Sequence, residues 1–157
     1  MATNENQNQQ AERQISVIVQ YVKDISFENP NSPNSLQPSN ERPNINVSVD
    51  VMAKKLEGEN NFEVELKIGV NAKRNEEILF IAEVNYAGIF LLKNIPDNEF
   101  QPALLIYCPN LLFPFVRRIV SDLTRDAGFP TLMLDPIDFG KLYMQRMEQL
   151  QKEQQAQ

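Results

Sequence analysis

The sequence lacks histidine altogether, which removes most familiar catalytic centres. Without histidine there is no Ser-His-Asp triad, no Cys-His pair and no histidine-based zinc site. The single cysteine, Cys108, cannot form an intrachain disulfide, and with no histidine base a buried apolar thiol is favoured over a nucleophile. Glycine is scarce, and neither a P-loop nor a GxGxxG motif occurs. Carboxylate-only or magnesium-dependent catalysis remains open.

Long hydrophobic runs and excess positive charge are also absent. The uncharged stretch Leu104–Val116 (LLIYCPNLLFPFV) is broken by Pro109 and Pro114, and it is shorter than the roughly 20 residues of a membrane span. No positively charged, apolar signal segment precedes it. The net charge of −6 disfavours nucleic acid and anionic membranes, and it either attracts cationic partners or only keeps the chain soluble. We expect a soluble, intracellular protein with no membrane insertion.

The 157 residues suit one domain with a sizeable core. Residues 1–12 are polar without periodicity, which predicts a disordered tail. Residues 151–157 are predicted to be a Gln-rich tail that follows a fraying helix. The folded domain is therefore expected over residues 13–150.

Four segments in the first two thirds of the chain are typical of β-strands, because apolar and polar residues alternate with a period of two. They span residues 15–28, 44–51, 62–70 and 77–90, and the last is apolar on both faces. In the first strand the alternation predicts one apolar face, made of Ile15, Val17, Val19, Tyr21, Ile25 and Phe27. The proline-rich residues 29–43 are predicted to be a surface crossover loop, and residues 71–76 a hairpin loop.

Helices are predicted only after the strands. Residues 111–127 carry an apolar stripe and end at Gly128, a suitable C-terminal cap. Residues 97–102 and the stretch around Pro109 are predicted to be turns, because proline disfavours helical geometry in the residue before it. Asp138 is expected to cap a last helix that reaches Leu150. This order predicts an α+β fold, a four-stranded antiparallel sheet packed by helices.

Two groups of residues in the strands suggest interaction surfaces. Asp24 and Glu28 share a strand face, as do Ile81 and Glu83, and each pair fits either a solvated surface or a docking patch. The fourth strand has apolar residues to spare, with Ile78, Phe80, Ala82, Val84 and Tyr86 expected on one face and Leu79 and Ile81 on the other. This surplus fits a subunit interface or a peptide groove, unless the last helix covers it.

Three strings in the chain resemble the SecB family of export chaperones: YVKDISFENP at residues 21–30, AGIF at 87–90 and the stretch 104–116. The resemblance covers residues 13–150. It implies a four-stranded sheet packed by helices, and subunits that pair into a dimer and then into a homotetramer, a dimer of dimers. It further implies no cofactor and no catalysis. Such a protein keeps unfolded secretory precursor proteins from folding in the cytoplasm and passes them to the SecA motor.

The resemblance also implies roles for individual residues. SecA-facing positions fall on Asp24, Glu28, Ile81 and Glu83, whose acidic groups would attract the basic, zinc-binding tails of SecA. Positions near subunit contacts fall on Ala82, Val84 and Tyr86. Groove positions for clients, each of which fits an ordinary core position equally well, fall on Phe27, Ile45, Val47, Phe113, Phe115, Tyr143 and Met147.

Some features depart from the family, and other functions remain open. Relatives often carry an aromatic residue in the crossover loop, where this chain offers only Leu36, and Ala87 stands where many relatives have glycine. One alternative is a SecB-like chaperone dedicated to a single client such as an antitoxin. Another is an α+β domain that binds a small molecule in an apolar cavity. The intact acidic set favours the export chaperone.

Overall fold

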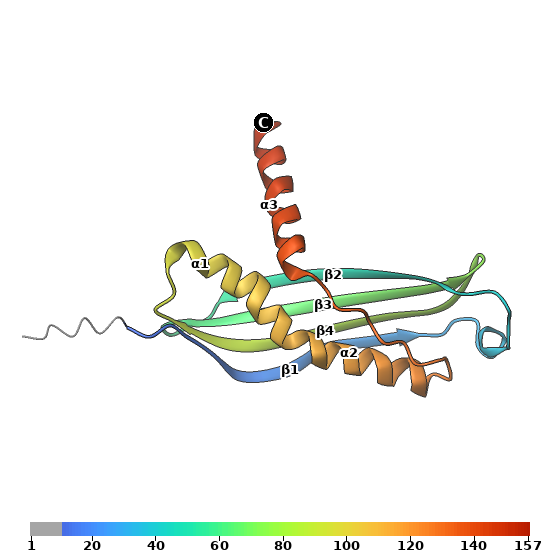
Figure 1. Cartoon of the computed structure of the whole chain (residues 1–157). Coiled ribbons are helices and arrows are strands. Elements are labelled where there is room, and N and C mark those ends of the chain that lie inside the picture. Colours follow the sequence, from blue (N-terminus) through green and yellow to red (C-terminus); the bar gives the residue numbers. More distant parts are fainter. Residues whose placement is uncertain (1–10) are drawn as a thin grey trace, which may run out of the picture.

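Four long strands form one antiparallel sheet in the computed structural model, which describes residues 11–157 (Figure 1). The strands lie in the order β1-β4-β3-β2, so the first two strands of the chain form opposite edges of the sheet. Their bounds are β1 (Gln14–Glu28), β2 (Asn44–Lys55), β3 (Asn61–Arg74) and β4 (Glu77–Lys93). The predicted α+β class and the crossover loop are confirmed. The tail predicted for residues 1–12 lies, up to residue 10, outside the described residues.

The two faces of β2 and β3 are those that the alternation predicts. In β3 the even-numbered residues from Phe62 to Ala72 are buried on the side covered by helices, here called the helix face. The odd-numbered residues, among them Glu63 and Lys67, lie on the other side, here called the open face. Alternation works here because β2 and β3 pair from end to end with no register shift.

The faces of β1 differ from the prediction because the strand is bulged twice. Register shifts at Ile18 and Lys23 each leave one residue of β1 without a partner on β4. Since side chains alternate with a period of two, each bulge turns the residues that follow to the other face. Val19 and Tyr21 therefore lie on the open face, whereas Phe27 lies on the helix face. The prediction of a single apolar face for this strand is wrong.

A third irregularity changes the predicted faces at the start of β4. The register shifts between Ala72 and Lys73 of β3, which leaves Leu79 as an extra residue in β4. Leu79 is part of the buried core, while Ile78 pairs with Lys73 on the open face. These two residues therefore exchange the faces that simple alternation assigns to them.

A continuous helical stretch crosses the helix face of the sheet and replaces two predicted turns (Figure 1). It consists of α1 (Asp97–Pro102), a π-helical turn η2 (Ala103–Tyr107) and α2 (Cys108–Asp126). Cys108 is helical, with φ −62° and ψ −47°, although it precedes a proline. The π turn lies just before Pro109, where proline cannot donate a regular helical hydrogen bond. Packing on the sheet thus overrides the local preference against helix.

This helical stretch is longer and more apolar than residues 104–116 alone suggest. By length and composition only, residues 97–126 would suffice to cross a membrane, as the core helices of soluble proteins also do. In this fold, 44% of the most apolar window is buried. Leu112, Val116 and Val120 are fully buried against the sheet, so core packing accounts for the apolar character.

Both predicted helix caps are confirmed. Gly128 follows α2 with φ +91°, and the amides of Gly128 and Phe129 donate to the carbonyls of Arg125 and Thr124, as in a Schellman motif. The Asp138 carboxylate accepts a hydrogen bond from the Lys141 amide at 3.0 Å and caps α3 (Phe139–Gln155). That helix runs past the predicted end at Leu150 and stands away from the sheet (Figure 1).

Removing the cap of α3 is expected to fray its first turn. Asp138→Ala should cost about 0.5–2 kcal/mol of local helix stability, because an amide of the first turn loses its acceptor. Amide hydrogen exchange at Lys141 and Leu142 measures this as faster exchange. Asp138→Asn keeps a capping oxygen and is the matched control; equal exchange in both variants would contradict the capping role.

Candidate functional site

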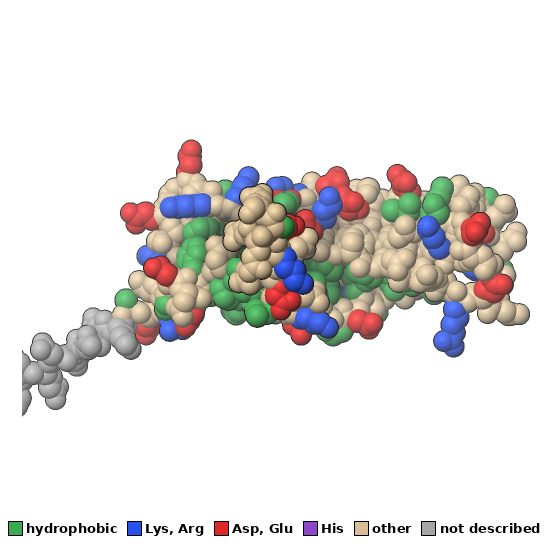
Figure 2. Space-filling view, turned by 90° about the horizontal axis from the view of Figure 1, so that it is seen from above, with side chains coloured by type: hydrophobic (Ala, Val, Ile, Leu, Met, Phe, Trp, Pro, Cys, Tyr) green, Lys and Arg blue, Asp and Glu red, His purple; other side chains and the backbone are tan. Residues whose placement is uncertain are grey.

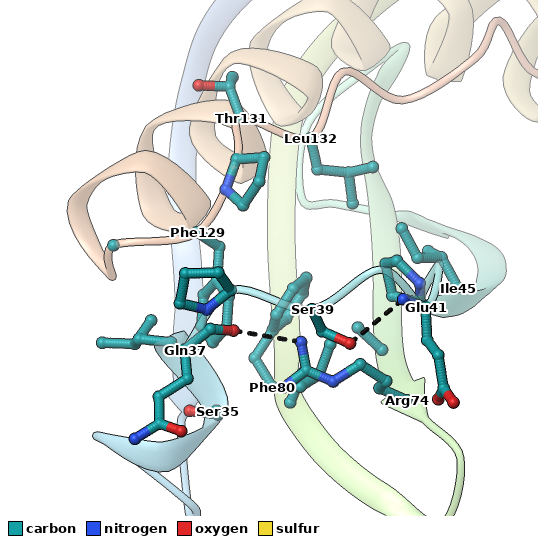
Figure 3. Close-up of a pocket in the computed structure, with 17 residues that line it drawn as sticks. Ser35, Gln37, Ser39, Glu41, Ile45, Arg74, Phe80, Phe129, Thr131 and Leu132 are labelled. Carbon is teal, nitrogen blue, oxygen red and sulfur yellow. Dashed lines mark hydrogen bonds between the residues drawn. The ribbon is translucent and has the colours of Figure 1, made fainter.

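An apolar pocket lies under the crossover loop at one end of the helix face (Figure 3). Its volume is about 390 Å³. The loop supplies one wall, the strand ends supply the floor, and the segment after α2 supplies the other wall. Arg74 at the end of β3 reaches the loop, and its guanidinium lies 3.5 Å from the carbonyl oxygen of Gln37. The apolar residues that line the pocket are Leu36, Pro38, Pro43, Ile45, Ala72, Leu79, Phe80, Phe129, Pro130 and Leu132.

A row of three aromatic rings leads into this pocket. Phe27 of β1 stacks on Phe80 of β4 with 5.4 Å between ring centroids, and Phe80 contacts Phe129 at 5.0 Å. Phe129 follows α2 and was not singled out by any pattern in the sequence, because its segment has no periodicity. It supplies an aromatic ring to the wall opposite the loop, and the loop itself contributes Leu36. The pocket therefore has an aromatic side chain from this segment, although the crossover loop contributes none.

The predicted groove residues fall into separate groups. Phe27 and Ile45 belong to the pocket region, and Val47 extends the same face of β2 with 45% of its surface exposed. Phe113 instead lies in the protomer core against Phe139, so it cannot line an open groove. The remaining three lie on the helices outside the pocket: Phe115 on α2, and Tyr143 and Met147 on α3.

The predicted acidic pairs meet on the open face. Strand pairing places Glu28 opposite Ile81, and Ser26, midway between the two β1 acids, opposite Glu83. Asp24 lies opposite Asn85 in the next row. Ile81, Glu83 and both β1 acids thus form one continuous patch across β1 and β4, at least partly exposed. The spacing along the sequence predicted two separate pairs of residues. The register of β1 on β4 brings the two pairs together in one patch.

A network of charged and polar side chains borders this patch. The Tyr21 hydroxyl donates to Glu63, and the Lys23 ammonium donates to Glu63 and Glu65, each at 3.1 Å. The hydrogen bond from Tyr21 and then that from Lys23 hold the pKa of Glu63 below its ordinary value, although burial alone would raise it. The pKa of Glu65 is lowered first by a hydrogen bond from Asn85. Burial and the bond to Glu63 raise the pKa of Tyr21 to about 12, so it remains a donor.

The network is expected to stabilise the fold above pH 4.5, the ordinary pKa of a glutamate. Because the folded-state pKa of Glu63 is lowered, this contribution is lost as the pH falls through that lower value. Glu63→Gln should reduce the free energy of unfolding at pH 7 by about 1–3 kcal/mol and flatten its decline in acid. Urea unfolding at several pH values measures both effects. Glu59→Gln, in the exposed β2–β3 turn, is the control, and identical curves for both variants would contradict the role of the network.

The predicted interface residues are buried inside the protomer. Ala82 and Val84 are 1% and 0% exposed on the helix face. Other parts of the protomer cover both side chains, and their place near subunit contacts stays a prediction. Tyr86 is also buried, but its ring stacks on Phe115 at 5.8 Å, and Phe115 is exposed on α2. These strand residues can influence an interface only through the helix that covers them.

Large apolar side chains are exposed elsewhere on the protomer. Five lie on the edge strand β1: Val17, Ile18, Val19, Val22 and Ile25. On the helical stretch formed by η2 and α2, Tyr107, Leu111 and Phe115 follow one another at intervals of four residues, and the first and third are exposed. Figure 2, which looks down on α3, shows hydrophobic side chains gathered beside the base of that helix. A long, exposed apolar edge strand is a typical site of pairing with another chain.

Within residues 11–157, the acidic side chains and Cys108 form no group of three or more that could hold a metal ion. Burial raises the pKa of the Cys108 thiol to about 12, so it stays protonated. The arrangement offers two surfaces for binding other molecules: the apolar pocket on the helix face and the acidic patch on the open face.

Comparison with known proteins shows that this chain is similar to a family of protein-export chaperones. A family model described as preprotein translocase subunit SecB matches residues 7–150. Protein-export protein SecB of Parvibaculum lavamentivorans is 52% identical over 87% of this chain and 80% of its own length. The SecB of Methylocella silvestris is 50% identical over 90% and 88%.

Among solved structures, the fold resembles the Mycobacterium tuberculosis SecB-like chaperone Rv1957, solved with a ChAD peptide from the Rv1956 HigA1 antitoxin. The TM-score is 0.65 at 13% identity, covering 78% of this chain and 90% of that one. At this identity the likeness concerns the fold alone.

Proposed function

The chain belongs to the SecB family of protein-export chaperones, and we propose that it holds secretory precursors unfolded in the pocket region and delivers them to SecA. The observation that carries this proposal is that the pocket continues into an exposed apolar face of strand β2. Ile45 lines the pocket and Val47 continues its face along β2. β2 is the last strand of the sheet, so within residues 11–157 one of its edges has no neighbouring strand.

Such a surface suits an extended polypeptide better than a small molecule. Apolar client side chains are buried in the pocket by the hydrophobic effect, which requires no particular sequence. The client backbone can pair with the free edge of β2, as in strand addition. Several weak contacts along one client then add up through multivalency. Neither step uses nucleotide hydrolysis, so client holding is proposed to be independent of ATP.

The open-face patch is proposed as the docking site for SecA. Its acidic groups, Asp24, Glu28 and Glu83, attract cationic segments, and the partly buried Ile81 supplies an apolar contact among them. Charge attraction of this kind mainly speeds association and makes binding sensitive to salt. Pocket and patch lie on opposite faces of the sheet, so a client and SecA can be bound at the same time.

We further propose a cytoplasmic homotetramer. The exposed apolar edge of β1 suits pairing with a second copy, which would extend the sheet and remove the free edge. The apolar side of α2 around Phe115 suits contact between two such dimers. Together these contacts would cover the exposed apolar side chains of β1 as well as Phe115.

Client holding is tested by diluting a reduced, denatured precursor into buffer with and without the protein and without nucleotide. Holding predicts that the precursor stays soluble and unfolded in a complex. Normal aggregation or refolding of the precursor would contradict the proposal. Val47→Asp, which places a charge on the extended surface, should weaken holding. Glu59→Gln is the control.

A further inference from the structure

The acidic patch is part of a larger ordered surface on the open face. Strand pairing arranges twelve residues of this face in three rows that run across all four strands. Among these twelve described positions four are acidic and only one is basic. The rows are Asp24, Asn85, Lys67, Asp50; then Ser26, Glu83, Gly69, Ser48; then Glu28, Ile81, Asn71, Asn46.

The one basic residue, Lys67, is already bound to the patch. Its ammonium lies 3.2 Å from Oε1 of Glu83 on the neighbouring strand. Gly69 lies directly opposite Glu83 and follows Lys67 on the same face, so no side chain stands between the two partners. Both partners are 45% exposed, so solvent and other ions reach the pair. Exposed ion pairs of this kind contribute little stability and are readily exchanged.

We propose that Lys67 is an internal competitor that sets the affinity of the patch for cationic partners. The inference rests on the proposed SecA docking site and adds a residue to it. A basic side chain of SecA reaches Glu83 only by displacing the Lys67 ammonium. A segment that carries one isolated positive charge gains little by the exchange, because it replaces one ion pair with another. A partner with several positive charges also engages Asp24 and Glu28, so Lys67 favours such partners over stray basic segments of clients.

Removal of the competing charge tests this role. Lys67→Gln should tighten SecA binding about three- to tenfold at low salt, and the gain should disappear in high salt, which screens exposed charges. Lys73→Gln is the matched control, since Lys73 is exposed on the same face of β3 and its loss changes the net charge equally. Client holding should be the same in all these variants.

A double-mutant cycle separates competition from general charge. In a Glu83→Gln background, Lys67→Gln should have a clearly smaller effect, because the pair it breaks no longer exists. An effect of Lys67→Gln no larger than that of Lys73→Gln would overturn the inference while leaving the docking site intact. If Glu83→Gln and Glu28→Gln also left SecA binding unchanged, the docking site itself would be refuted and the inference with it.

Discussion

Glu83→Lys is expected to weaken SecA binding about tenfold or more at low salt, because it turns attraction into repulsion at the centre of the patch. The new ammonium would lie beside Lys67, which loses its partner at the same time. Two adjacent positive charges then face the basic segments of SecA. Titration of SecA at several salt concentrations measures the effect, which should shrink as salt rises.

The control for this substitution is Glu57→Lys, which changes the net charge equally at the exposed β2–β3 turn, at the other end of the sheet. Client holding should be normal in both variants, since the pocket lies on the helix face. Equal SecA affinity of the two variants at low salt would contradict docking at the open face.

Phe115→Asp is expected to convert the tetramer into smaller assemblies. Phe115 is 40% exposed on the apolar side of α2, where a second dimer is proposed to pack. A carboxylate buried in that contact would have no partner, and an unpaired buried charge opposes association strongly. Sedimentation velocity should show loss of the tetramer, while urea unfolding of the protomer changes little.

Two further variants make this test specific. Phe115→Leu keeps an apolar side chain and should keep the tetramer. Tyr86→Asp, by contrast, would place a charge in the protomer core, since Tyr86 is only 8% exposed. It is expected to destabilise the protomer itself and therefore cannot report on assembly alone. An unchanged tetramer in Phe115→Asp would refute the proposed contact.

Several parts of the fold could be predicted from sequence because the local signal and the tertiary structure agree. β2 and β3 pair without irregularity, so period two assigned their faces correctly. Asp138 and Gly128 act through their own helix ends, so the rules of capping sufficed. The crossover loop followed from proline content alone.

Other parts depended on contacts that the sequence does not display. The bulges at Ile18, Lys23 and Leu79 are set by pairing with a neighbouring strand, and each reverses the alternation. The helix continues through Pro109 because its apolar side chains pack in the core against the sheet. Proline alone would disfavour helical geometry at this point. A pattern confined to one segment cannot reveal such an outcome.

The candidate sites likewise combine features that local sequence predicted with features that depend on tertiary contacts. Spacing paired Asp24 with Glu28 and Ile81 with Glu83, but only the register of β1 on β4 brings the pairs together. Phe129 and Lys67 escaped notice because their roles arise from neighbours distant in the sequence. Phe113 seemed suited to a groove by its chemistry, but its position on the buried side of α2 places it in the core.

Multi-angle light scattering decides whether the protein assembles and holds unfolded clients. The protein is measured alone and after addition of a reduced, denatured precursor. We expect the mass of a tetramer for the protein alone and the mass of a tetramer with bound client in the mixture. A monomer whose mass does not change when the unfolded precursor is added would contradict this expectation.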